Sequence, residues 1–276
     1  MGSCIPAATD EPDHPATPVE QRHTRHGYYA AISYADDRVG QVLSELARSQ
    51  QLAEKTIISI NGDHGWQLGE GNEYCKHTLF ENALRTALLI HVPWLPESFG
   101  SVRTELFELL DLFPTLQELA GFEVSAFQEG VSQAPLFHPK RSPEQKEGVW
   151  SAAPPSPRQV ALAQFPRCVT PGSEPATQYW DHNNCNQDTT EQYTVMGYTM
   201  RTESGWRYTR WVPWNQTTLS PEWSKGDYGE ELYDFRGEGL FGDFDMQSDN
   251  LAADEPMRGL VEQLRKQLQE EFTTSR

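Results

Sequence analysis

The sequence predicts an α/β fold, in which a layered part with helices and buried strands is followed by a small antiparallel sheet with a helix. Two observations support this prediction. Helical periodicity and short apolar runs alternate over residues 20–127, which is typical of layered α/β structure. Short runs rich in β-branched and aromatic residues, separated by turns, follow within residues 158–276. With 276 residues and 37% hydrophobic content, the chain can bury a core.

Residues 20–51 are predicted to form the first helix. Residues 1–19 before it are polar and proline-rich, and we expect them to be a disordered lead. Apolar residues recur in the predicted helix at intervals of three and four, which is the spacing of one helical face. These residues are Tyr28, Ala31, Ile32, Ala35, Val39, Val42, Leu43 and Leu46.

Two short apolar runs are predicted to be buried strands. Residues 56–60 are rich in isoleucine, and residues 87–92 end at Pro93, which lacks the N–H that a sheet needs. Residues 105–120 are again apolar with helical spacing, and Gly121 is the expected C-cap. Helix, strand, strand and helix in this order indicate part of a layered sheet.

The character of the chain changes after a connector. Residues 128–157 are poor in periodicity and rich in Pro, Ser and charge, and we interpret them as a link between two domains. Residues 158–276 then form the predicted α+β domain, closed by an amphipathic helix over residues 260–272. Its expected strands are residues 160–164, 194–201, 206–211 and 231–235.

Composition and charge exclude several classes of function. A net charge of −18 and a pI near 4.8 argue against nucleic acid as a partner, because phosphate binding requires a basic surface. No stretch approaches the length and hydrophobicity of a membrane span. The first residues lack the apolar core of a signal peptide, so we expect either a cytosolic protein or, preferably, a natural start that differs from Met1.

Weak signals agree with a lysosomal or secreted protein. Cys168 and Cys185 bracket a loop that a disulfide could close, and Asn215 begins an N-glycosylation sequon. The acidic composition also suits an acidic compartment, in which the carboxylates would be partly neutralised.

The segment that carries the candidate chemistry follows the first predicted strand. Asp63 and His64 stand where that strand ends, among several glycines, and Lys76 follows a short loop later. A carboxylate and an imidazole can ligate a divalent cation, and a lysine can bind an anion held by that cation. Each residue has an ordinary alternative: Asp63 as a turn cap, Lys76 as a solvated lysine and Trp66 as a packing residue.

Several motifs in the right order resemble the sulfatase family. They are residues 28–40, residues 63–70, Lys76 and residues 108–116. Downstream, residues 163–167, 196–202 and 229–234 are also similar to sulfatases, in particular to those of the iduronate-2-sulfatase type. The resemblance implies the C-terminal part of an alkaline-phosphatase-like sulfatase sandwich, followed by the family's small C-terminal antiparallel sheet and helix.

The resemblance also implies residue roles. Asp63 and His64 match two of the positions that hold a calcium ion, and His at the second position is itself typical of the iduronate type. Lys76 matches the lysine that contacts the sulfate oxygens and would stabilise charge on the transferring group. Trp66 and His77 would line the sugar side of the site. The family's nucleophile is a formylglycine made from the cysteine of Cys-x-Pro-Ser-Arg.

The chain departs from the family in its nucleophile half. Neither Cys-x-Pro-Ser-Arg nor the other calcium-binding Asp-Asp pair is found; residues 4–8 lack the Ser and Arg of the motif, and Asp36-Asp37 falls in a helical pattern. We therefore expect a C-terminal portion of an enzyme that hydrolyses sulfate esters of glycosaminoglycan uronic acids, as in dermatan and heparan sulfate, without turnover by this chain alone. Two alternatives stay open: a non-catalytic sulfatase relative that binds sulfated sugar, and an alkaline-phosphatase-like phosphohydrolase.

Overall fold

The structure, a computed structural model, describes residues 16–137, 158–167, 193–237 and 249–273. The chain forms two compact units that are each discontinuous in sequence. The first unit contains residues 1–64, 72–74 and 86–158, and the second contains residues 65–71, 75–85 and 159–276. The predicted disulfide between Cys168 and Cys185 lies outside the described residues, as does most of the predicted connector.

The first unit begins with a long helix, α1 (Pro18–Ala47), followed by the short α2 (Gln50–Ala53). A capping box starts α1: the Thr17 hydroxyl accepts from the Glu20 N–H, and the Glu20 carboxylate accepts from the Thr17 N–H at 2.8 Å. Pro18 occupies the first turn, where its missing N–H costs nothing. The predicted helix is therefore confirmed, with a break after Ala47.

The two predicted strands of the first unit pair with each other, but neither contains a buried residue, so the predicted burial is wrong. β1 (Ile58–Asn61) and β4 (Leu88–His91) are antiparallel, with Ile58 opposite His91 and Asn61 opposite Leu88. The predicted helix at residues 105–120 is shorter than expected: a 3₁₀ turn at Leu109–Asp111 leads into α4 (Leu112–Leu119). The C-cap is Ala120, one residue before the predicted Gly121, and Gly121 follows it with φ of +83°, a conformation that glycine adopts readily.

A buried ion pair and a small apolar cluster hold the first unit together. Asp111, which is fully buried, accepts from the Arg158 Nε–H at 2.6 Å and from the backbone N–H of Val131 at 2.8 Å. The Arg158 guanidinium also pairs with Glu108 at 3.0 Å. The buried apolar residues of this cluster are Val92, Leu95, Leu119 and Ala134.

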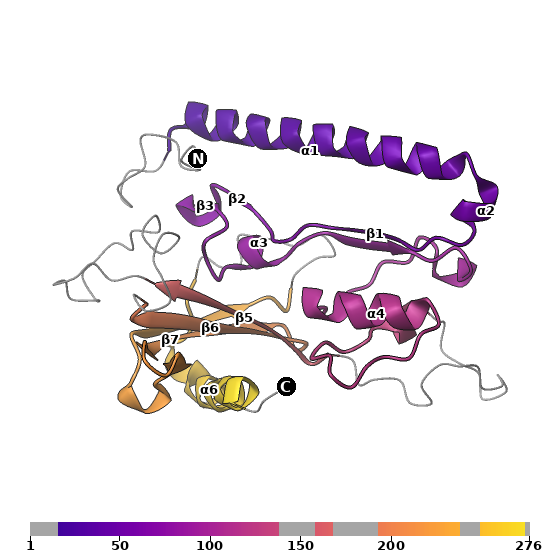
Figure 1. Cartoon of the computed structure of the whole chain (residues 1–276). Coiled ribbons are helices and arrows are strands. Elements are labelled where there is room, and N and C mark those ends of the chain that lie inside the picture. The colour runs from indigo at the N-terminus through magenta and orange to yellow at the C-terminus, as the bar shows by residue number, and fades with distance from the viewer. Residues whose placement is uncertain (1–15, 138–157, 168–192, 238–248, 274–276) are drawn as a thin grey trace. The chain divides into compact units, whose positions relative to one another are not determined.

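The second unit contains the predicted antiparallel sheet and its helix (Figure 1). Its strands lie in the order β5-β6-β7-β8. β9 pairs with residues 206–211 of β7, along the edge opposite β6. The strands are β5 (Val160–Arg167), β6 (Val195–Thr202), β7 (Trp206–Asn215), β8 (Ser220–Pro221) and β9 (Gly229–Asp234). The closing helix is α6 (Arg258–Thr273), so both parts of this prediction are confirmed.

The second unit has the larger core. One face of the sheet packs against α6 through Val261, Leu264 and Leu268 (Figure 1). The buried sheet residues of this core are Val160, Met196, Tyr198, Met200, Trp206, Tyr208, Val212 and Leu232. Within the described residues, no helix is long and apolar enough to cross a membrane.

Four short elements lie between β1 and β4 in the sequence: β2 (Gln67–Leu68), a 3₁₀ helix (Glu70–Asn72), β3 (Tyr74–Cys75) and α3 (Glu81–Leu84). Most of this stretch belongs to the second unit, although the chain before and after it belongs to the first. The candidate functional residues are found in this stretch and in the turn that precedes it.

Candidate active site

A tight turn holds Asp63 and His64 at the exit of β1. The Gly62 N–H donates to the carbonyl of Ala87 at 3.1 Å, which ties the turn to the residue just before β4. A Cβ on Gly62 would lie 2.2 Å from the Thr86 hydroxyl oxygen, so a larger residue fits here only if the Thr86 side chain moves. The predicted metal-ligand pair therefore stands on a short turn whose backbone is fixed at its first residue.

Asp63 and His64 form a close pair of possible ligands. The His64 Nε2 and Asp63 Oδ1 atoms are 3.5 Å apart, and the side chains are 29% and 87% exposed. Two donors at calcium-ligand distances and at right angles about one ion lie roughly 3.4 Å apart, so this spacing fits ligation of one cation. The carboxylate oxygen suits calcium, whereas an imidazole is a less usual ligand for it.

The pair is only part of a ligand set. Calcium takes about six to eight oxygen ligands. In the part of the chain that the structure describes, no group of three or more His, Cys, Asp or Glu side chains is arranged to hold a metal ion. Within the described residues, Asp63 and His64 thus supply two candidate ligands, fewer than calcium takes.

The other predicted site residues belong to the second unit. Trp66, Lys76 and His77 are all half-buried, so Lys76 is not the fully solvated lysine of the ordinary alternative. The turn that begins their segment is tightly packed: the Gly65 N–H donates to the Ala83 carbonyl at 2.9 Å. A Cβ on Gly65 would lie within 2.3 Å of two backbone carbonyl oxygens.

Buried polar contacts fix the segment that carries Lys76. The Thr78 hydroxyl donates to the Gln67 side-chain oxygen at 2.8 Å, and both residues are buried. Glu81, also buried, accepts from the Arg207 Nε–H at 3.0 Å and lies 3.8 Å from Arg201. Burial raises the pKa of Glu81, but the two guanidinium groups outweigh that effect and hold its pKa below the usual value.

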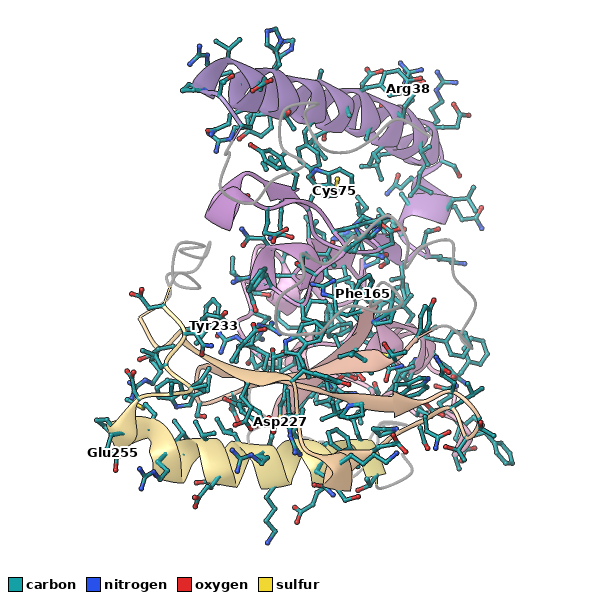
Figure 2. The ribbon with its side chains drawn as sticks, turned by 90° about the vertical axis from the view of Figure 1, so that its left-hand side faces the viewer. Arg38, Cys75, Phe165, Asp227, Tyr233 and Glu255 are labelled. Carbon is teal, nitrogen blue, oxygen red and sulfur yellow. The ribbon has the colours of Figure 1, made fainter. Side chains whose placement is uncertain are left out.

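The sheet positions His77 through residues that the sequence analysis did not assign to the site. The Arg167 Nη1 atom donates to the His77 carbonyl at 2.9 Å, and the His77 ring stacks on Phe165 with 6.0 Å between centroids. The Arg167 guanidinium also lies over Trp211, 4.9 Å from its ring centroid. Phe165, labelled in Figure 2, and Arg167 come from the end of β5. Their only sequence signal was the resemblance of residues 163–167 to sulfatases.

The predicted residues thus fall into two groups. The structure brings Asp63 and His64 together in the first unit. It places Trp66, Lys76 and His77 on one anchored segment of the second unit. The first group can contribute to a cation site. The second group, which follows closely in the sequence, supplies an ammonium group and aromatic side chains.

The fold has known counterparts among solved structures. The phosphonate monoester hydrolase SpPMH from Silicibacter pomeroyi matches with a TM-score of 0.64 at 19% identity, over 95% of this chain and 43% of that one. A protein solved in complex with its substrate D-glucosamine-2-N,6-O-disulfate matches with a TM-score of 0.57 at 20% identity, over 91% of this chain and 42% of that one. The predicted α/β sandwich with its small antiparallel sheet is confirmed.

The family follows from sequence comparison. Residues 6–122 match the sulfatase family, to which this region of the chain belongs. Human iduronate 2-sulfatase is 32% identical over 244 residues, which cover 76% of this chain and 42% of that protein. Choline-sulfatase from Rhizobium meliloti is 36% identical over 120 residues, covering 42% of this chain and 23% of that protein. The chain spans about half the length, or less, of the curated relatives it matches.

Proposed function

We propose that this chain supplies part of the active site of a calcium-dependent sulfatase that hydrolyses sulfate esters on the uronic acids of glycosaminoglycans. The pairing of Asp63 with His64 at 3.5 Å, inside the region that matches the sulfatase family, is the observation that carries this proposal. Similarity to iduronate 2-sulfatase supports the choice of sugar, with dermatan and heparan sulfate as the substrate class. A lysosomal or secreted location would suit these substrates.

The residues have distinct roles in this proposal. Asp63 and His64 would hold the calcium ion, which when bound polarises a sulfate oxygen. Lys76 donates hydrogen bonds to the sulfate oxygens and stabilises the charge that develops as the sulfuryl group transfers. Trp66 and His77 contact the sugar. Arg167 and Phe165 are positioning residues, because Arg167 donates to the His77 carbonyl and Phe165 stacks on the His77 ring.

In this proposal, the chain by itself does not supply the nucleophile. The 276 residues contain no Cys-x-Pro-Ser-Arg sequence, from which the family's formylglycine is made. We infer that the chain alone binds calcium and sulfated sugar without turning the ester over. Metal-dependent hydrolysis of an aryl sulfate by the purified 276-residue chain would contradict this inference.

Calcium titration tests the site. We expect the chain to bind calcium weakly, with a dissociation constant on the order of a millimolar because the ligand set is partial. Asp63→Asn should abolish the binding heat in isothermal titration calorimetry, and Lys76→Met should leave it unchanged. Asp37→Asn, on an exposed carboxylate of α1, is the matched control. Equal binding by the wild type and Asp63→Asn would overturn the assignment.

Ester binding separates the sulfatase from the phosphohydrolase alternative. A sulfated disaccharide from heparin should bind the wild-type chain, and Lys76→Met should weaken its binding about tenfold, as expected for loss of one charge-assisted contact. The non-catalytic alternative predicts the same binding, and only turnover by the completed enzyme distinguishes it. Preference for a phosphate ester over the matching sulfate ester would favour the phosphohydrolase alternative.

A further inference from the structure

The hairpin that follows β7 carries the single N-glycosylation triplet of the sequence. Asn215, the last residue of β7, begins the triplet Asn-Gln-Thr, and no other asparagine of the chain begins an Asn-x-Ser/Thr triplet. The pairing of β7 with β8 places Asn215 opposite Ser220, so residues 216–219 form the connecting turn. All four turn residues are exposed, and a surface turn is where such a glycan is attached.

Hydrogen bonds fix the direction of the Asn215 side chain. Its Oδ1 atom accepts from the backbone N–H groups of Thr217 and Thr218, both at 2.9 Å. Its Nδ2 atom, to which an N-linked glycan would be joined, donates to the Glu222 Oε1 atom at 3.3 Å. A glycosylated Nδ2 atom keeps one N–H, so this hydrogen bond can persist after attachment. The attached sugar would therefore start beside Glu222.

Glu222 is also part of a hollow in the surface of the second unit. The hollow has a volume of about 510 Å³, which lies within the range of roughly 300–1,000 Å³ that is typical of small-ligand sites. Its lining combines carboxylate, ammonium, hydroxyl and amide groups with the apolar surface of a proline and a tryptophan. The lining residues are Pro221, Glu222, Trp223, Ser224, Lys225 and Gln269. These donors and acceptors match the hydroxyl and acetamido groups of an amino sugar.

The hollow lies on the α6 side of the sheet. Gln269 belongs to α6, and Trp223 packs against the core that α6 shares with the sheet. Trp211, over which the Arg167 guanidinium lies, is on the opposite face, because it precedes Val212 of that core and successive strand residues face opposite sides. A sugar in the hollow would thus be separated by the sheet from the residues that position the candidate site.

We propose that Asn215 carries an N-linked glycan whose first N-acetylglucosamine occupies this hollow. The oligosaccharide comes from a polyprenyl diphosphate donor. A bond forms between the Asn215 Nδ2 atom and the anomeric carbon, the bond from that carbon to the diphosphate oxygen breaks, and a proton passes from Nδ2 to a base of the transferase. The sugar then bridges residues 221–225 and Gln269, which fastens the hairpin to α6. This inference does not depend on the proposed sulfatase activity.

Attachment of the glycan is tested on the full chain, secreted from cultured eukaryotic cells behind a cleavable signal peptide. Because the sequence has one triplet, we expect a single glycan, which peptide mass spectrometry should place on Asn215. Thr217→Ala keeps the backbone N–H that Asn215 accepts and should abolish attachment, whereas Thr217→Ser should retain it. A secreted wild-type chain without a glycan on Asn215 would overturn the proposal.

Thermal unfolding tests whether the sugar occupies the hollow. We expect Gln269→Ala to lower the Tm of the glycosylated chain by roughly 2–4 °C, because the side-chain amide loses its hydrogen bond to the sugar. The same substitution in the Thr217→Ala background should leave the Tm unchanged. Trimming the glycan to one N-acetylglucosamine with an endoglycosidase should preserve the effect, because that sugar is the one in the hollow.

A matched control comes from the same helix. Gln263→Ala, at an exposed position of α6 outside the hollow, should change the Tm equally with and without the glycan. If the Thr217→Ala chain is not secreted, the wild-type chain from a bacterial host that lacks this modification supplies the reference. An effect of Gln269→Ala that is equal in both backgrounds, or absent from both, would place the glycan in solvent and overturn the proposal.

Discussion

Two glycines frame the candidate ligand pair, and each has a different neighbour. Gly62 faces the Thr86 hydroxyl, whereas Gly65 faces the backbone carbonyls of Asn82 and Arg85. The hydroxyl can rotate away from an added methyl group, but the carbonyls are fixed by the local fold. The geometry of Asp63 and His64 therefore depends more strictly on Gly65.

We expect Gly65→Ala to lower the free energy of unfolding by about 1–3 kcal/mol, the usual cost of overpacking. The added Cβ would lie 2.1 Å from the Asn82 carbonyl oxygen, so the backbone must move. Urea denaturation followed by circular dichroism measures the loss. Gly259→Ala in α6, where nothing lies within 4 Å, is the matched control and should be neutral or stabilising. Equal effects of both substitutions would contradict this account.

The sequence indicated candidate residues for the site but not the contacts that position them. Asp63, His64 and Lys76 could be selected because their chemistry and spacing are visible in the chain. The support that Arg167 gives to His77 could not, because the two residues are 90 positions apart and the contact is to a backbone carbonyl. Backbone contacts of this kind leave no pattern in a single sequence.

At the scale of elements, the charge pair between α3 and β7 anchors the segment that carries Lys76. Glu81 and Arg207 are both buried, so removing one partner would leave the other charge without compensation. The pair joins residues 126 positions apart, and neither residue stands out in the sequence. Helix and strand positions were predictable from periodicity, but this pairing depends on the tertiary fold.

We expect Glu81→Gln to destabilise the protein by about 3 kcal/mol at neutral pH. The pKa of Glu81 is lowered in the folded protein, so its contribution is present above the unfolded pKa of 4.5 and is lost as the pH falls through the folded pKa. The wild type should therefore lose stability below about pH 4.5 more steeply than the variant. Thermal unfolding at a series of pH values measures this.

Glu45→Gln provides the control for this measurement. Glu45 pairs with Arg48 on the exposed surface of α1, and such pairs contribute about 0–1 kcal/mol. At every pH, the free energy of unfolding of this control should stay within about 1 kcal/mol of the wild-type value. If Glu81→Gln loses stability at low pH as steeply as the wild type, the prediction is wrong, and other carboxyl groups cause that loss.

Strand pairing shows where prediction from sequence stops. The apolar runs at β1 and β4 were recognised, but their antiparallel pairing was not specified by either run alone. Element ends also shifted: β7 continues to Asn215, four residues beyond the predicted Trp211, through Val212, Pro213 and Trp214. The expected turn there comes later because Trp214 and Asn215 pair with β8.

At the scale of the whole molecule, the two units differ in how much core they bury. The second unit packs α6 against a five-stranded sheet, whereas the first has a two-stranded sheet and a small cluster. Burial of apolar surface is the main source of stability. The units should therefore differ in local stability.

We expect backbone amides of β6 and β7 to exchange hydrogen more slowly than those of β1 and β4. Hydrogen–deuterium exchange with mass spectrometry measures the difference. Leu232→Ala, at a fully buried core position of β9, should speed exchange in β6 and β7, with a loss of about 2–5 kcal/mol. Slower exchange in β1 and β4 than in β6 and β7 would contradict the inferred order of stability.

The interleaved course of the chain has a practical consequence. Residues 75–85 belong to the second unit although residues 86–158 return to the first. A fragment that begins at residue 159 contains the strands of the large sheet and α6 but not Glu81. The Arg207 guanidinium would then be buried without its carboxylate partner. No single cut in the sequence separates the two units. A fragment designed to express the sheet should therefore include residues 75–85 as well.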